Sequence, residues 1–211
     1  MGVVPFIWQE LLKSPPPKQR YNNLDYFKKF LKVEAAVLDS LFYFKPNFCS
    51  MLAPHPLWST CGSSPAKIAM ATVQAQMISG RFRTEELCSN WSKNKLGVCL
   101  LSKECSSTVE NLQHILSLCT ALQPTRDKMM KFTEDYSKKF PVIKDLVLSL
   151  CDQSSPLFSQ FLLDCSSLPS VITAAQLHGD EIYRHLFHIT RTGVYTLHKT
   201  RMKLLGHWNP F

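Results

Sequence analysis

The stretch CLLSKECSSTVENLQHILSLC, residues 99–119, decides how this chain is expected to fold. It contains three cysteines and one histidine in the pattern Cys99-x5-Cys105-x8-His114-x4-Cys119. Thiolate sulfur and imidazole nitrogen are donors that tetrahedral zinc prefers, and four of them fill its coordination shell. The pattern therefore predicts one structural Zn2+ site, with no open coordination position at which a substrate could be activated.

The second half of this stretch has the pattern of a short helix. Ser107 and Glu110 have the spacing of a capping box, with Ser107 as the N-cap. Apolar residues follow at helical spacing, namely Val109, Leu112, Ile115 and Leu116. On such a helix His114 lies away from the apolar side, and a continuing helix would turn Cys119 away from His114. We therefore expect the helix to end near Leu118, so that both residues reach one metal ion.

The chain has eight cysteines, and the other cysteines do not share this clustering. Cys88 lies eleven residues before Cys99, and it is the one further cysteine that could replace a ligand. We expect no metal at the scattered cysteines, which are Cys49, Cys61, Cys151 and Cys165. On spacing alone an alternative stays open, in which the cysteines are unliganded and serve as small buried apolar residues.

The composition is that of a packed, basic protein. The 211 residues are 45% hydrophobic and carry a formal net charge of +8, which favours an anionic partner. No apolar run reaches the roughly 20 residues of a membrane span, and no secretory signal is recognisable. We therefore expect an intracellular protein of the cytoplasm or nucleus, without a membrane partner and with reduced thiols.

Apolar periodicity, with proline and glycine as punctuation, predicts a mainly helical fold. N-terminal helices and an irregular linker are expected over 1–62, and a helix with a basic connector over 63–96. The zinc-binding module, a small zinc knuckle, is expected over 97–122. A helical, basic C-terminal region is expected over 123–211.

Individual helices are predicted within these regions. One helix is expected over 67–79 and is stopped by Gly80. A second is opened by Pro124 and closed by Pro141. VIKDLVLSLC and PLFSQFLLDC each read as a short buried helix, and a last helix is expected over about 180–205.

The last predicted helix has an unbalanced positive charge. No acidic residue follows Glu181, whereas the cations Arg184, Arg191, Lys199, Arg201 and Lys203 do. Arg81 and Arg83 add positive charge just before the cysteine cluster. Such cations neutralise phosphates, and interleaved aromatic rings stack on unpaired bases, so we predict nucleic-acid binding. The alternative is an amphipathic helix that packs its apolar side in the core and exposes its cations to solvent.

From about Asp39 to its end, the chain resembles the C-terminal region of non-LTR (LINE-type) retrotransposon polyproteins, beyond the reverse transcriptase. The stretches that carry this resemblance are SLFYFKPNF, HPLWSTCGSSP, QMISGRFRTEELCSNWS, GVCLLSKEC, VENLQHILSLCTALQPTR, FLLDCSSLP and LFHITRTGVYTLHKTRMKLLGHW. The middle stretches look like the reverse-transcriptase zinc-binding module of those elements. The resemblance implies zinc on Cys99, Cys105, His114 and Cys119, although the first loop is one residue longer than in similar sequences.

The catalytic parts of such polyproteins have no counterpart in this sequence. No adjacent pair of aspartates occurs, so the metal-binding carboxylates of a polymerase are missing, and no endonuclease constellation is present. We therefore expect no enzyme, but a detached accessory module that binds RNA or DNA and associates with a reverse transcriptase. Two alternatives remain, a zinc-stabilised protein-interaction scaffold and a truncated relic without a function of its own.

Overall fold

The structure, a computed structural model, describes residues 55–92, 94, 96–153 and 157–206. The chain divides into two compact units, 1–51 and 52–211, and every described residue belongs to the second unit. The predicted N-terminal helices lie outside the described residues, as do Cys49 and most of the region predicted as 1–62.

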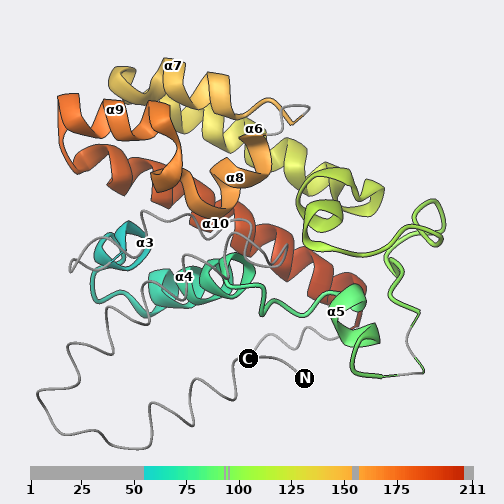
Figure 1. Ribbon diagram of the computed structural model, residues 1–211. Helices are drawn as coiled ribbons and strands as arrows, with labels where there is room; N and C mark the ends of the chain where they lie inside the picture. Colours follow the sequence, from blue (N-terminus) through green and yellow to red (C-terminus); the bar gives the residue numbers. More distant parts are fainter. Residues whose placement is uncertain (1–54, 93, 95, 154–156, 207–211) are drawn as a thin grey trace, which may run out of the picture. The chain divides into compact units, whose positions relative to one another are not determined.

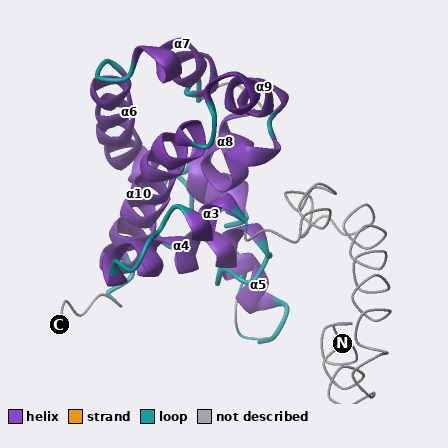
Figure 2. Cartoon of the chain, turned by 90° about the vertical axis from the view of Figure 1, so that its left-hand side faces the viewer, coloured by secondary structure: helices purple, strands orange, loops and turns teal. Residues whose placement is uncertain are grey.

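The described residues form helices and no strand (Figure 2), which confirms the prediction of a mainly helical fold. The α-helices are α3 (Pro56–Ser59), α4 (Pro65–Ile78), α5 (Glu85–Ser89), α6 (Gln123–Ser137), α7 (Pro141–Leu150), α8 (Leu157–Asp164), α9 (Pro169–His178) and α10 (Glu181–Leu204). A π-helical turn, η3 (His114–Leu118), and two 3-10 turns, η4 (Thr120–Leu122) and η5 (Cys165–Ser167), complete the described elements.

Proline opens most of these helices. A proline occupies one of the first two helical positions of α3, α4, α6, α7 and α9. Its fixed φ suits the first turn, where its missing N–H leaves no helical hydrogen bond unmade. Pro141 was predicted to close the preceding helix, but α6 already ends at Ser137 and Pro141 begins α7. Helix α9 was not predicted.

Helix α10 is the centre of the described unit (Figure 1). It contacts α4, α6, α8 and α9, and its 24 residues span about 36 Å. Buried apolar side chains recur every three to five residues along it and include Ile182, Leu186, Ile189, Val194 and Leu197. This spacing lines one side of an α-helix, so a single stripe of α10 supplies much of the core. None of the described helices combines the length and apolar character that a membrane crossing requires.

Helices α6 and α10 approach each other closely at Gly193. A Cβ atom added there would lie 2.3 Å from the Met129 Sδ atom and 2.9 Å from its Cγ atom. The absence of a side chain at Gly193 therefore lets Met129 pack against the backbone of α10.

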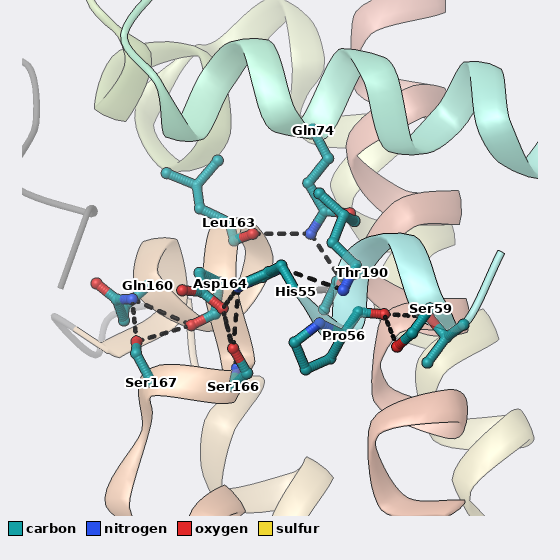
Figure 3. A network of polar contacts seen from close by, with 12 residues as sticks. His55, Pro56, Ser59, Gln74, Gln160, Leu163, Asp164, Ser166, Ser167 and Thr190 are labelled. Carbon is teal, nitrogen blue, oxygen red and sulfur yellow. Dashed lines mark hydrogen bonds and ion pairs between the residues drawn. The ribbon is translucent and has the colours of Figure 1, made fainter. Parts of the chain in front are cut away.

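Buried polar contacts fix helices that are distant in sequence. The Gln74 side-chain amide donates hydrogen bonds to the carbonyl oxygens of Leu162 and Leu163 at 2.8 and 2.9 Å, and contacts the Thr190 hydroxyl at 3.2 Å (Figure 3). Gln74 is fully buried, so these contacts replace the hydration of its side-chain nitrogen. They join α4 to α8 and α10.

Candidate metal centre

A short backbone pairing brings the first cysteine toward the later ligands. The Cys99 amide donates to the Thr108 carbonyl at 2.9 Å, and the Glu110 amide donates to the Gly97 carbonyl at 2.9 Å. Between these bonds Val98 and Val109 form an isolated antiparallel bridge. The chain therefore folds back on itself between Cys99 and residue 108, as a knuckle-like loop.

This pairing overturns the predicted capping box. Val109 lies in the bridge rather than on a helix, and Ser107 does not cap the turn that follows. Asn111 does so instead, because its side-chain oxygen accepts a hydrogen bond from the His114 amide at 2.8 Å. The physical reason is that pairing with residues 97–99 satisfies the backbone of residues 108–110, which the predicted helix would have used.

The turn after Asn111 ends at Leu118, as expected. Its last hydrogen bond runs from the Cys119 amide to the His114 carbonyl at 2.7 Å, a span of five residues. This π-type bond widens the turn, so residues five apart come to the same side. Cys119 itself is extended, with φ −64° and ψ 117°, and it ends the turn. His114 and Cys119 can therefore face one point.

The four predicted ligands converge on that point. Their candidate ligand atoms all lie within 4.8 Å of one another, and all four residues are buried. The sulfur atoms of Cys99 and Cys119 are 3.8 Å apart. Metal–sulfur bonds of about 2.3 Å in a tetrahedral shell place two sulfurs about 3.8 Å apart. The cluster of Cys99, Cys105, His114 and Cys119 could thus hold a metal ion.

The imidazole of His114 supports this fit. Its side chain is buried, and within the described part of the chain neither ring nitrogen has a hydrogen-bond partner. Buried polar atoms without a partner are costly, and a metal ion bound to one ring nitrogen would relieve part of this cost. Burial also lowers the pKa of His114 and thereby favours the neutral imidazole, which is the form that binds metals.

The pKa values of the three thiols indicate how a bound cation would change their protonation. Burial raises the pKa of Cys119 to about 12, and burial likewise raises the pKa of Cys99. At Cys105 burial also raises the pKa, but hydrogen bonds from Thr120 and Ser102 outweigh it and lower the pKa to about 7. A bound divalent cation deprotonates its cysteine ligands outright, so it would convert the buried thiols to thiolates.

Glu110 links this cluster to the rest of the fold, and the sequence analysis missed that role. Its fully buried carboxylate accepts a hydrogen bond from the Glu85 amide at 3.0 Å and forms an ion pair with Arg201. It thereby holds the beginning of α5 and the last turns of α10 against the knuckle. No local signal could have revealed this, because the partners lie 25 and 91 residues away.

The remaining described cysteines stand apart from the cluster. Among the described residues, the only group that could hold a metal is the one formed by the four predicted ligands. Cys88 is not in it, and neither is any of the more distant cysteines Cys61, Cys151 and Cys165.

Two of the predicted nucleic-acid contacts require correction. Arg191 is 2% exposed, and its guanidinium donates to the Leu57 carbonyl at 2.9 Å and the Thr60 carbonyl at 3.2 Å. Arg201 is 3% exposed and is paired with Glu110. Both guanidiniums are used inside the protein, so they are not available to phosphates.

The other five predicted cations, Arg81, Arg83, Arg184, Lys199 and Lys203, are exposed. The Phe82 ring lies 5.4 Å from the His198 ring and 5.7 Å from the Arg201 guanidinium carbon. Arg81 and Arg83 flank Phe82 in sequence, and Lys199 and Lys203 belong to the last turns of α10, which the Phe82 ring contacts. Arg184 lies about 22 Å from Lys199 along the helix.

A Ser–His–Asp group elsewhere in the fold does not have the arrangement of a catalytic triad (Figure 3). The Nε2 atom of His55 lies 3.4 Å from the Asp164 carboxylate and 3.3 Å from the Ser166 hydroxyl. Its Nδ1 atom accepts a hydrogen bond from the Leu57 amide at 3.2 Å. The neutral ring therefore carries its proton on Nε2 and cannot accept the serine proton there. The group joins the start of α3 to the end of α8.

Comparisons of the sequence with protein-family models, curated proteins and solved structures find no match. The resemblance to retrotransposon polyproteins therefore stays a prediction from the stretches quoted above.

Proposed function

We propose that the cluster binds one Zn2+ ion whose role is structural. The supporting observation is that three cysteines and a histidine, all buried, face one point with the spacing of a tetrahedral shell. Four protein ligands leave no position for a substrate or an activated water. The ion would stabilise a loop that buries little apolar surface of its own.

We further propose that the zinc-stabilised module is a non-catalytic accessory unit that binds RNA or DNA. The resemblance to non-LTR retrotransposon polyproteins supports this, together with the net charge of +8. The observation that carries the proposal is that four predicted cations, Arg81, Arg83, Lys199 and Lys203, are exposed on two segments that meet where Phe82 packs against the last turns of α10. Association with a reverse transcriptase and an intracellular location belong to the same proposal.

The test combines a metal assay with a salt titration. The purified chain is analysed for bound metal and titrated with labelled single-stranded RNA and DNA at several salt concentrations. Replacing the four exposed cations with Gln should flatten the log–log salt dependence by up to roughly 2.8, at about 0.7 for each phosphate contact. A matched control replaces four exposed lysines on and after α6, which are Lys128, Lys131, Lys138 and Lys139. Equal flattening in both variants would contradict a localised interface.

A second candidate function is a protein-interaction scaffold. Alternation in the paired knuckle turns Cys99 inward and its neighbours outward. Leu100 and Val109 are 62% and 47% exposed, and nearby Leu96 is 87% exposed, so aliphatic surface is available beside the cluster. Bound zinc without any salt-dependent binding of RNA or DNA would favour this candidate. A chain that does not fold even when zinc is supplied would point to a relic.

A further inference from the structure

Arg126 is buried beside the candidate metal cluster, and among the described residues it has no carboxylate partner. It lies in the first turns of α6 and is 1% exposed. Its Nη2 atom donates to the Cys119 carbonyl and to the Gln123 side-chain oxygen, each at 2.6 Å. Its Nη1 atom donates to the Ile115 carbonyl at 3.5 Å. Each of these acceptors is neutral.

A guanidinium in this position requires an anion. Arginine stays charged in proteins, and a buried charge without a counter-ion is strongly destabilising. The neighbouring Asp127 is exposed, and its carboxylate accepts a hydrogen bond from Gln123. The guanidinium instead lies against the backbone of Cys119, a member of the cluster. The cluster therefore supplies an anion for Arg126 when it carries a net negative charge.

The charges balance when the cluster holds a divalent cation. Three thiolates, a neutral imidazole and a divalent cation together carry one negative charge. The positive charge of Arg126 cancels it. The nearby pair of Glu110 and Arg201 is already neutral, so it leaves this balance unchanged.

We propose that Arg126 is the counter-ion of the metal centre and that its charge stabilises the three-thiolate form of the site. This inference rests on the zinc site proposed above. Arg126 touches the backbone of one ligand and not the metal, so it is a positioning residue. Its fixed charge offsets the excess negative charge of the ligands, while its bond to the Cys119 carbonyl fixes the chain at the last ligand.

The test compares zinc affinities, measured by chelator competition, for Arg126→Gln, Arg126→Lys and the exposed control Lys128→Gln on the same helix. All proteins are purified with zinc bound, so that a variant that is unfolded without the metal can still be compared. Arg126→Gln should bind zinc about 10- to 100-fold more weakly, as for other residues that support metal ligands. Arg126→Lys should recover most of this loss, because it keeps the charge, and Lys128→Gln should match the wild type.

A second experiment changes the charge of the site by replacing one of its ligands. Cys105→His replaces one thiolate with a neutral ligand and makes the centre electrically neutral. In that background Arg126→Gln should cost clearly less zinc affinity than it costs in the wild type. The absorption of bound Co2+ reports the number of thiolate ligands in each protein.

The outcomes separate the two proposals. If the wild type binds no zinc, the proposed function fails and this inference fails with it. If the wild type binds zinc but Arg126→Gln binds equally tightly, only the counter-ion role is overturned. It is also overturned if Arg126→Lys loses as much affinity as Arg126→Gln, or if Arg126→Gln costs the same in the Cys105→His background, since either result would assign the effect to hydrogen bonding alone.

Discussion

Arg201 forms a buried ion pair with Glu110, although 91 residues separate them in the sequence. Arg201 is 3% exposed and Glu110 is fully buried, so neither charge is solvated by bulk water. The same carboxylate oxygen of Glu110 accepts a hydrogen bond from the backbone of Glu85. One side chain thus joins the metal-binding loop, α5 and the end of α10.

Breaking this pair from one side should destabilise the fold strongly. Arg201→Gln leaves the Glu110 carboxylate buried without its cation, and we expect a loss of about 3–5 kcal/mol in the free energy of unfolding. Denaturant titration of zinc-loaded protein measures it. The control is Lys138→Gln, which removes an exposed pair with Glu134 and should cost no more than about 1 kcal/mol. Similar losses in the two variants would contradict the role given to Arg201.

Metal content should depend on the four clustered residues and on no other cysteine that the structure describes. His114→Ala and Cys119→Ser should each lower the bound zinc from one ion per chain toward none, because each removes one of four ligands. Cys88→Ser is the control and should keep the full metal content. Elemental analysis of purified protein gives the result, and unchanged zinc in His114→Ala would remove that residue from the site.

Replacement of Arg191 and replacement of Arg184, which lie on the same helix, should have unequal effects on stability. Arg191→Gln should lower the free energy of unfolding by at least about 2 kcal/mol, because several charged hydrogen bonds to the end of α3 are lost. Arg184→Gln, at an exposed position, should change stability by less than about 0.5 kcal/mol.

In nucleic-acid titrations, Arg191→Gln should leave the salt dependence unchanged as long as the protein is folded. A flatter salt dependence in folded Arg191→Gln would show that this guanidinium reaches phosphates after all.

Alkaline pH should destabilise the metal-free chain more than the metal-loaded chain. The pKa of Cys119 in the fold, about 12, lies above its ordinary value of 9.0, and that of Cys99 is also raised. The stabilisation from a protonated thiol is fully present below pH 9 and is lost as the pH rises toward 12. With metal bound, these ligands are already thiolates, so their contribution to this loss disappears.

Thermal unfolding between pH 8 and 11 tests this difference. Cys151 lies outside the cluster, and burial raises its pKa to about 12 as well. It contributes equally to both forms, so only the difference between them reports on the cluster. Identical pH profiles with and without metal would contradict the prediction.

A methyl group at Gly193 should destabilise the contact between α6 and α10. Alanine favours a helix over glycine by about 1 kcal/mol, but its Cβ would overlap the Met129 side chain. Overpacking of this kind costs about 1–3 kcal/mol, so Gly193→Ala should be neutral to destabilising. In a Met129→Ala background the overlap is gone and the same substitution should be stabilising. Denaturant titrations of the four proteins give the sign in each background.

The clustering of Cys99, Cys105, His114 and Cys119 and the long helix α10 could be predicted because their signals are local. The three cysteines and the histidine lie within residues 99–119, and the stop at Leu118 follows from the requirement that His114 and Cys119 face one point. Helix α10 was predicted within about a residue at each end, since its apolar stripe is continuous over its length. Such features depend on residues that are near one another in the chain.

The errors arise where distant segments compete with local preference. The predicted capping box at Ser107 was wrong for two reasons. The Glu110 side chain contacts Glu85 and Arg201 instead of the helix start. In addition, the backbone of residues 108–110 pairs with residues 97–99. The burial of Arg191 could not be read from its neighbours either, since Leu57 lies 134 residues away. In a basic segment, the sequence alone does not distinguish an arginine that is exposed to solvent from one whose guanidinium donates to a distant backbone carbonyl.

The five-residue hydrogen bond from the Cys119 amide to the His114 carbonyl places the end of a helical turn inside the candidate metal centre. Neither glycine nor proline ends this turn, and the chain leaves it at an extended cysteine that can be anchored through its sulfur. Deleting one residue between the two ligands would restore the ordinary four-residue repeat and allow the helix to run on. The number of residues between His114 and Cys119 therefore decides whether this turn stops at Leu118 or can continue.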